Sequence, residues 1–209
     1  MKKIISILFG ASLLFAASAQ AAGIVGFKVG QGEIDGSSTA YTAGSTSYGA
    51  ESGSKNNQYA AIFAELNIEA AGGLSLGVEY IPFEARISLD KGHADVENAT
   101  SLYALYAKDA GQGSVYVKAG YFMADIGTVA NSNGHGKTVN AQDDTLEGPM
   151  VGLGLQSGET AQGIIIRAEA TYTELDSVAI TTTSNGSTSV KKTADGDITT
   201  FSVSFAKAF

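Results

Sequence analysis

The last thirteen residues, Asp197 to Phe209, constrain the fold most strongly because their side chains alternate in character. Phe201, Val203, Phe205 and Phe209 fall on one face of an extended segment, and small or polar residues fall on the other. A soluble domain would leave the final aromatic ring exposed at a fraying terminus. In a membrane β-barrel, the last strand closes the barrel and its aromatic residue lies in an interfacial girdle. The segment therefore predicts a strand and favours a barrel in contact with lipid.

The N-terminal residues 1–21 have the pattern of a secretory signal peptide. Two lysines precede an apolar run from Ile4 to Ala17, and small residues follow as far as Ala21. The run is shorter than the roughly 18 residues that a membrane-spanning helix needs. We therefore expect cleavage after Ala21 and a single transmembrane barrel domain over residues 22–209. The chain has no cysteine, so we expect no disulfide, lipid-anchored cysteine or thiolate metal site.

Charge and composition exclude several function classes. The signal peptide holds two of the 13 basic residues, so the mature chain has 11 basic and 21 acidic residues and a net charge of −10. An acidic exported chain is a poor candidate for binding nucleic acid. No later segment has the length and hydrophobicity of a transmembrane helix, so membrane insertion would have to use strands. Abundant glycine, serine and threonine, with two prolines, favour strands and turns.

Seven earlier segments alternate in the same way as the last one. The eight predicted strands are Gly23 to Gly32, Gln58 to Glu69, Leu74 to Phe83, Thr100 to Lys108, Ser114 to Ile126, Met150 to Ser157, Ile164 to Thr173 and Asp197 to Phe209. The connections are alternately long and short, and the long ones cover residues 33–57, 84–99, 127–149 and 174–196. This order predicts an all-β fold, an eight-stranded antiparallel up-and-down transmembrane β-barrel with short periplasmic turns and four long extracellular loops.

These features resemble the small outer-membrane β-barrel proteins of the OmpA/OmpX type. The resemblance rests on the signal peptide, the eight strands, the loop order and the final Phe-Ala-Lys-Ala-Phe, and it covers the mature chain. It implies an outer-membrane location in a Gram-negative cell envelope, contacts with lipid and lipopolysaccharide, and a monomer. It also implies that Phe201, Val203, Phe205 and Phe209 form the assembly signal read by the barrel-assembly machinery. The loop sequences identify no extracellular partner.

The face opposite the apolar one supplies the predicted lumen. It carries a network of eight charged side chains, four of each sign: Lys28, Glu65, Glu69, Glu79, Lys108, Lys118, Arg167 and Glu169. A lysine or arginine facing the bilayer midplane costs about 2–4 kcal/mol, so we expect these residues to point inward. Side chains fill an eight-stranded barrel, and buried charges need partners. We therefore expect a salt-bridge ladder, centred on Arg167 and Lys118 with Glu169 and Glu65.

Outward aromatic side chains are predicted to form two girdles at the membrane interfaces. Tyr80, Tyr103, Tyr121, Tyr172 and Phe201 lie toward the long-loop ends of their strands, whereas Phe209 lies at the opposite end. Tyrosine suits an interface because its ring contacts apolar groups while its hydroxyl remains hydrated.

The predicted function is a structural and surface-interaction role, with a filled lumen and without catalysis, cofactor or metal. A small porin-like pore for ions or small solutes is the first alternative, and a soluble lipocalin-like binding barrel is the second. A lipid-modifying enzyme is the third. Its candidate residues, His93 and His135, fall in predicted loops without a serine or carboxylate at a suitable spacing. The Asp195–Asp197 pair lacks the ligand count of a calcium site.

Overall fold

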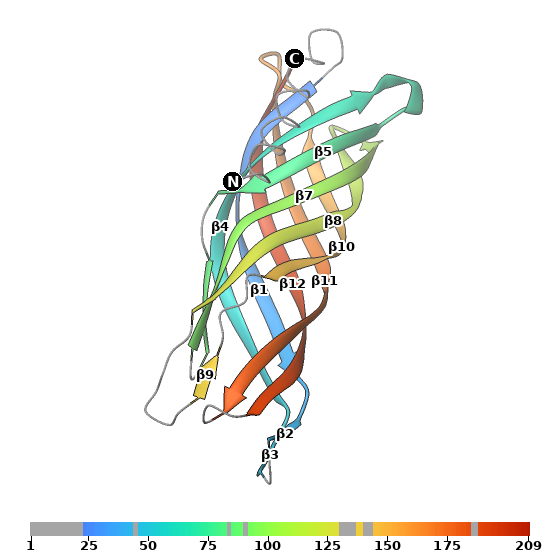
Figure 1. Ribbon diagram of the computed structural model, residues 1–209. Coiled ribbons are helices and arrows are strands. Elements are labelled where there is room, and N and C mark those ends of the chain that lie inside the picture. Colours follow the sequence, from blue (N-terminus) through green and yellow to red (C-terminus); the bar gives the residue numbers. More distant parts are fainter. Residues whose placement is uncertain are drawn as a thin grey trace.

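The computed structural model describes residues 23–43, 46–82, 85–89, 92–129, 137–139, 144–184 and 188–209. Its eight long strands form a closed antiparallel barrel (Figure 1), which confirms the predicted fold class. The long strands are β1 (Gly23–Ser38), β4 (Glu51–Ile68), β5 (Leu74–Ile81), β7 (Gly92–Ala110), β8 (Gly113–Val129), β10 (Asp144–Ser157), β11 (Ile164–Ser184) and β12 (Thr188–Ala208). The predicted signal peptide lies outside the described residues.

Each long strand pairs with its neighbours along the chain, and β1 pairs with β12 to close the barrel. Short elements complete the described part: β2 (Tyr41–Ala43), β3 (Thr46–Tyr48), β6 (Ala85–Leu89), β9 (Lys137–Val139) and the 3-10 turn η1 (Glu69–Ala71). Figure 1 places β2, β3 and β9 at the end of the barrel opposite the C-terminus. We call that end the hairpin end, and the other the turn end. No helix among the described residues is long and apolar enough to cross a membrane.

The seam between β1 and β12 matches the pairing predicted for the final strand. The ladder runs from Ile24 opposite Ala208 to Ser38 opposite Ala194. Phe27 lies opposite Phe205, and their rings stack with centroids 5.4 Å apart. Two further backbone hydrogen bonds, each 3.1 Å long, join Gly23 and Phe209. The final residue of the chain is therefore part of the closed wall.

Two strand pairs extend far beyond their predicted ends toward the hairpin end. β11 and β12 stay paired as far as Ser184 opposite Thr188, so most of the predicted loop over residues 174–196 belongs to this ladder, and β9 pairs with β11 near its tip. β1 and β4 pair as far as Ser38 opposite Glu51. The prediction of long structureless loops was wrong here, because polar residues on both faces remove the alternation by which a strand is recognised. His93, also predicted in a loop, belongs to β7.

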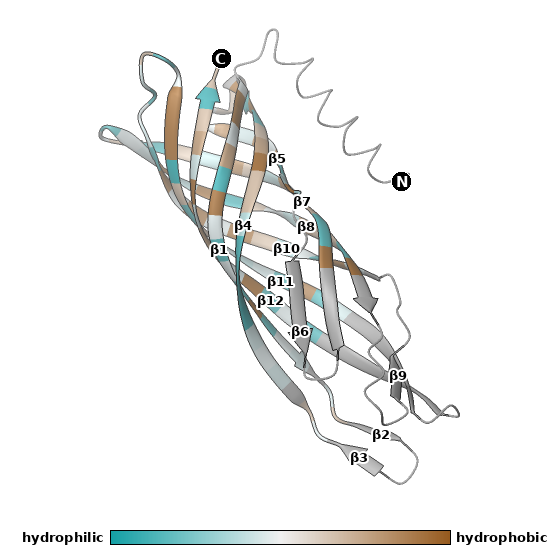
Figure 2. Ribbon diagram, turned by 90° about the vertical axis from the view of Figure 1, so that its left-hand side faces the viewer, coloured by the Kyte–Doolittle hydropathy of each residue, from teal (hydrophilic) through white to brown (hydrophobic). Residues whose placement is uncertain are grey.

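The outer face of the barrel carries an apolar belt. The alternation of the sequence predicted the outward residues correctly for seven of the eight strands, with β7 as the exception. Apolar and polar residues alternate along these strands (Figure 2). The exposed large apolar residues include Phe27, Val29, Ile62, Leu76, Leu102, Val115, Val117, Val151, Leu153, Leu155, Ile164, Ile166, Phe201, Val203 and Phe205. The ladder between β10 and β11 ends at Met150 opposite Thr173, next to Pro149, which has no backbone N–H to donate.

The facing of β7 was predicted wrongly. Tyr103 and Leu105 point into the lumen and are 6% and 1% exposed, whereas Tyr106 is 48% exposed on the outer face. Residues 102–107 repeat the sequence leucine–tyrosine–alanine, so both faces of the strand carry apolar or aromatic residues. The alternation therefore could not distinguish the inner face from the outer one. A shift of one residue in the assumed register moves every side chain to the other face. The ladder between β7 and β8 also contains an irregularity between Glu97 and Thr100.

Candidate functional site in the barrel lumen

Six of the eight charges predicted for the lumen lie together inside the barrel. Lys28 comes from β1, Glu65 from β4, Glu79 from β5 and Lys118 from β8, while Arg167 and Glu169 come from β11. Each occupies an inward position of its strand, and each is between 2% and 8% exposed. Three positive and three negative charges therefore share one buried layer, which we call the ion network.

Of the two other predicted lumen charges, Lys108 lies elsewhere, and the side chain of Glu69 lies outside the described part of the structure. Lys108 is exposed because β7 faces the opposite way from the prediction. Glu69 lies in η1, beyond the end of β4 at Ile68, so the strand alternation that assigned it to the lumen does not apply. The correction for Lys108 concerns a residue near the turn end, where β7 gives way to a connection.

Two lysines and two glutamates form a closed ring of alternating charge. The ammonium of Lys28 donates hydrogen bonds to Glu79 Oε2 at 2.5 Å and to Glu169 Oε1 at 2.6 Å. The ammonium of Lys118 donates to the same two oxygens at 3.1 and 3.2 Å. Each carboxylate thus bridges two ammonium groups, and the four charges sum to zero. We call this set the lysine–glutamate ring.

The other pair is a two-pronged ion pair between Arg167 and Glu65. Arg167 Nη1 lies 2.6 Å from Glu65 Oε1, and Nη2 lies 2.8 Å from Oε2. This planar arrangement is the strong form of an arginine–carboxylate interaction. Arg167 Nε donates to Gln156 Oε1 at 3.0 Å, and the Tyr103 hydroxyl donates to Glu65 Oε1 at 2.8 Å. The remaining hydrogen-bonding capacity of both charges is thereby largely satisfied.

Aromatic side chains pack against the ion network. The Lys118 ammonium lies 3.9 Å from the centre of the Tyr103 ring, and the Arg167 guanidinium lies 5.6 Å from the rings of Phe63 and Tyr116. These distances allow cation–π attraction. The Tyr116 hydroxyl donates to Glu169 Oε2 at 3.1 Å. Tyr103 therefore belongs to the lumen and not to the outer girdle. The sequence prediction overlooked that a tyrosine hydroxyl can also be accommodated inside the barrel when a buried acceptor, here Glu65, lies within reach.

Apolar layers lie on both sides of the ion network. On β11, Ile165 precedes Arg167 toward the turn end, and Leu175 follows Glu169 toward the hairpin end. The layer at the turn end contains Ile24, Phe63, Ile165 and Ala206, and that at the hairpin end contains Val96, Ala99, Phe122, Ala124, Leu146 and Leu175. A cavity of about 570 Å³ opens at the turn end and reaches Arg167. Arg167 is thus the member of the ion network that lines that cavity.

The other predicted girdle residues lie on the outer face. Tyr121, Tyr172 and Phe201 are exposed toward the hairpin end, and Phe209 is exposed at the turn end. The half-buried Tyr80 donates a 3.2 Å hydrogen bond to Asn98 Oδ1. The exposed outer face also carries Tyr106, which the mistaken facing of β7 had placed in the lumen.

Comparison with known proteins finds similarity in structure alone. No protein-family model and no curated protein sequence matches the chain. OprG of Pseudomonas aeruginosa, an outer-membrane protein, matches with a TM-score of 0.66 and 14% identity, over 90% of this chain and 97% of that one. The outer-membrane protein AlkL, solved in lipid bilayers, matches with a TM-score of 0.61 and 11% identity, over 91% of this chain and 90% of that one.

An enzyme is also among the proteins of similar structure. The outer-membrane protease OmpT of Escherichia coli matches with a TM-score of 0.50 and 8% identity, over 90% of this chain and 97% of that one. At such low identities, these likenesses establish the fold and no common activity. The chain therefore has the fold of the small eight-stranded outer-membrane β-barrels, which is the fold that the resemblance to the OmpA/OmpX type implied.

Proposed function

We propose that the protein is an integral outer-membrane β-barrel with a structural and surface-interaction role, and that its filled lumen does not conduct. The ion network between two apolar layers is the observation that carries this proposal. Part of the proposal is that residues 1–21 direct export and are removed. The barrel would then insert as a monomer through the assembly machinery, and its belt would contact lipid and lipopolysaccharide.

The distribution of polarity supports membrane insertion over a soluble binding barrel. A lipocalin-like barrel encloses an apolar ligand cavity and presents a polar outer face to water. In this protein, the buried layer at the centre is charged, while the outer belt exposes large apolar side chains on all eight strands. Soluble monomers rarely expose a contiguous apolar surface that extends over all their strands. Lipid is the solvent that matches it.

The contacts of the ion network support a closed lumen. Conduction through a charged constriction requires binding sites that an ion can enter and leave, and a ring of one sign is the usual arrangement. Here each ammonium contacts two carboxylates, and Arg167 is held by both oxygens of Glu65. A permeating ion would have to separate these buried pairs, which is costly because desolvated charges need their partners.

Two measurements test the proposal. The first is carbonate extraction of membranes together with heat-modifiable gel migration, for which we expect retention in the membrane pellet and a shift on boiling. Release into the supernatant would instead support the soluble barrel. The second is conductance of the full-length purified protein in planar bilayers, for which we expect no discrete steps. Regular steps from the wild-type protein would refute the filled lumen and support the small pore.

We also propose that the barrel is not an enzyme. The third alternative from the sequence, a lipid-modifying enzyme, depends on His93 and His135. The backbone of His93 lies in β7, and His135 lies outside the described residues. We expect the lipid A and phospholipid profiles of cells carrying His93→Ala or His135→Ala to match those of wild-type cells. A missing acylated or deacylated lipid species in either variant would contradict this expectation.

A further inference from the structure

A groove crosses the apolar belt on the wall formed by β10, β11, β12, β1 and β4. It has a volume of about 880 Å³. Small side chains, Ala168 and Ala170 of β11, lie between larger neighbours, and the most exposed of these are Leu153 at 65% and Phe201 at 67%. Val29 continues the apolar lining onto β1. We call this feature the apolar groove.

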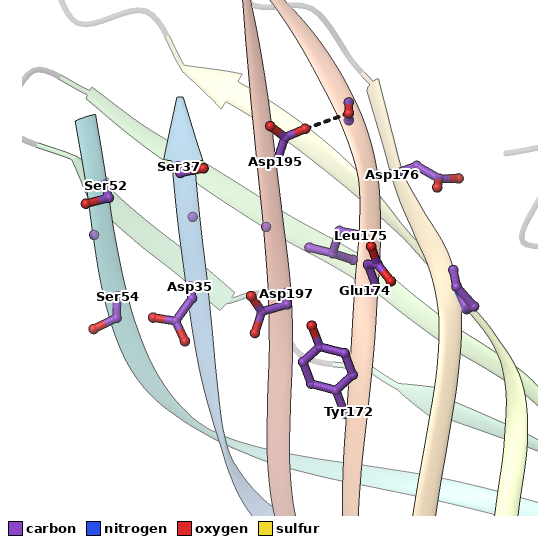
Figure 3. Close-up of a pocket in the computed structure, with 15 residues that line it drawn as sticks. Asp35, Ser37, Ser52, Ser54, Tyr172, Glu174, Leu175, Asp176, Asp195 and Asp197 are labelled. Atoms are coloured by element: carbon purple, nitrogen blue, oxygen red, sulfur yellow. Dashed lines mark hydrogen bonds between the residues drawn. The ribbon is translucent and has the colours of Figure 1, made fainter. Parts of the chain in front are cut away.

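A second hollow, of about 910 Å³, lies farther along the same wall toward the hairpin end (Figure 3). It is lined by five carboxylates and several hydroxyl groups: Asp35, Glu174, Asp176, Asp195, Asp197, Ser37, Ser52 and Ser54. Asp197 of β12 pairs directly with Asp35 on one side and with Glu174 on the other. Three carboxylates therefore stand in one row across three adjacent strands. We call this hollow the acidic recess.

The negative charge of the acidic recess is not balanced within its lining. None of the lining residues that the structure describes is basic. The Ser177 hydroxyl donates to Asp195 at 2.6 Å and the Tyr121 hydroxyl donates to Asp176 at 3.2 Å, but neither group carries a positive charge. Like charges directly opposite on neighbouring strands are destabilising. A hollow lined by charges of one sign concentrates ions of the opposite sign.

The recess and the groove are aligned along the same strands. On β11, the groove includes residues 168–170 and the recess begins at Tyr172. On β12 and β1, the groove includes residues 201–203 and 29–31, and the recess includes residues 195–197 and 35–37. From Ala170 to Glu174, the distance along β11 is about 13 Å at the usual rise per residue. An apolar site and a negatively charged site thus lie within reach of one amphiphilic molecule.

We propose that this wall binds a cationic amphiphile, with its alkyl chain in the apolar groove and its ammonium or guanidinium group in the acidic recess. Charge complementarity selects the occupant, because an anionic lipid head would face the row of Asp35, Asp197 and Glu174. The proposal rests on the proposed function, since the groove contacts lipid only if the barrel is inserted in a membrane.

A second outer groove provides an internal control. It has a volume of about 470 Å³ and is lined by residues of β5, β7 and β8, including Leu76, Leu102 and Ala119. No carboxylate belongs to its described lining. This control groove should contact lipid chains in the same way as the apolar groove, without a preference for a cationic head.

The absence of tryptophan from the chain allows a local test. Full-length Phe201→Trp and Leu102→Trp variants each place a single tryptophan, one at the apolar groove and one at the control groove. In phosphatidylcholine vesicles, each is titrated with a brominated alkyltrimethylammonium and with a brominated alkylphosphocholine of the same chain length. At position 201, we expect quenching by the cationic compound at about fivefold lower concentration than at position 102, and no difference for the zwitterionic compound.

Substitutions separate the contribution of charge from that of shape. In the Phe201→Trp background, Asp35→Asn, Glu174→Gln and Asp197→Asn together should abolish the preference. A control variant that also loses three exposed carboxylates, through Glu97→Gln, Asp109→Asn and Glu159→Gln outside the recess, should retain it. Equal cationic quenching at both positions, or a preference that survives the triple substitution, would overturn the proposal. Selective quenching by a brominated anionic lipid that requires added Ca²⁺ would also overturn it, in favour of phosphate bound through the metal.

The same titration distinguishes failure of this proposal from failure of the proposed function. If the zwitterionic bromolipid quenches neither tryptophan, the barrel is not inserted and the proposed function fails. If it quenches both equally and the cationic compound shows no preference, only the amphiphile site is refuted.

Discussion

The Arg167–Glu65 pair allows a quantitative test of the ion network. Glu65→Ala would leave the Arg167 guanidinium, which is 5% exposed, without its carboxylate and would deprive the Tyr103 hydroxyl of its acceptor. Removing one partner of a buried ion pair typically costs about 3–5 kcal/mol, because the remaining charge stays desolvated. The double variant Glu65→Leu with Arg167→Met removes both charges and keeps apolar volume. We expect it to lose less than about 2 kcal/mol, since buried pairs are often replaceable by apolar groups.

The assay is urea unfolding of each variant in phospholipid vesicles, followed by the fraction that keeps the heat-modifiable gel mobility. The decisive quantity is the coupling free energy from the cycle of wild type, Glu65→Leu, Arg167→Met and the double variant. We expect the double variant to lose less unfolding free energy than the two single variants lose together, by at least about 1 kcal/mol. Additive losses, or a Glu65→Ala loss below about 1 kcal/mol, would refute the claim that the two groups depend on each other.

Three further predictions concern the wall. Deleting Phe209 removes the two backbone hydrogen bonds to Gly23 at the seam, and we expect it to reduce the amount of assembled barrel in membranes more than it lowers the unfolding midpoint. Normal membrane levels of the truncated protein would contradict this. Gly77→Ala would place a Cβ 2.4 Å from the Tyr103 ring and should cost about 1–3 kcal/mol in urea unfolding, whereas Gly53→Ala, with no atom within 4 Å, should leave stability unchanged. Leu153→Arg in the belt should cost about 2–4 kcal/mol in vesicles, and a neutral effect there would exclude Leu153 from the bilayer core.

Alternation in the sequence predicted the architecture and much of the interior, because one face of each strand meets a different solvent from the other. Lys28, Glu79, Lys118 and Arg167 could be assigned to the interior from neighbouring apolar residues alone. Their partners were harder to predict. Glu65 and Arg167 lie 102 positions apart, and their meeting depends on the tilt and stagger of strands around the barrel. The sequence prediction grouped Lys118 with Glu169 but did not assign Lys28 and Glu79 to the same ring.

The failure at β7 shows what the lumen charges contribute to the fold. On most strands, a slip of one residue would turn a buried charge toward lipid, at a cost of about 2–4 kcal/mol for each lysine or arginine at the midplane. That penalty fixes the register of β1, β8 and β11, which carry Lys28, Lys118 and Arg167. The segment of β7 over residues 100–108 carries a single charge, Lys108, close to the turn end. Its facing is therefore set by weaker signals, chiefly the hydrogen bond from the Tyr103 hydroxyl to Glu65. The ion network thus specifies the orientation of the strands that carry it, beyond whatever it adds to stability. Three strands, β7, β10 and β12, contribute no charge to it. The facing of β10 and β12 could still be read from the contrast between large apolar residues and small or polar ones, a contrast that residues 102–107 of β7 lack.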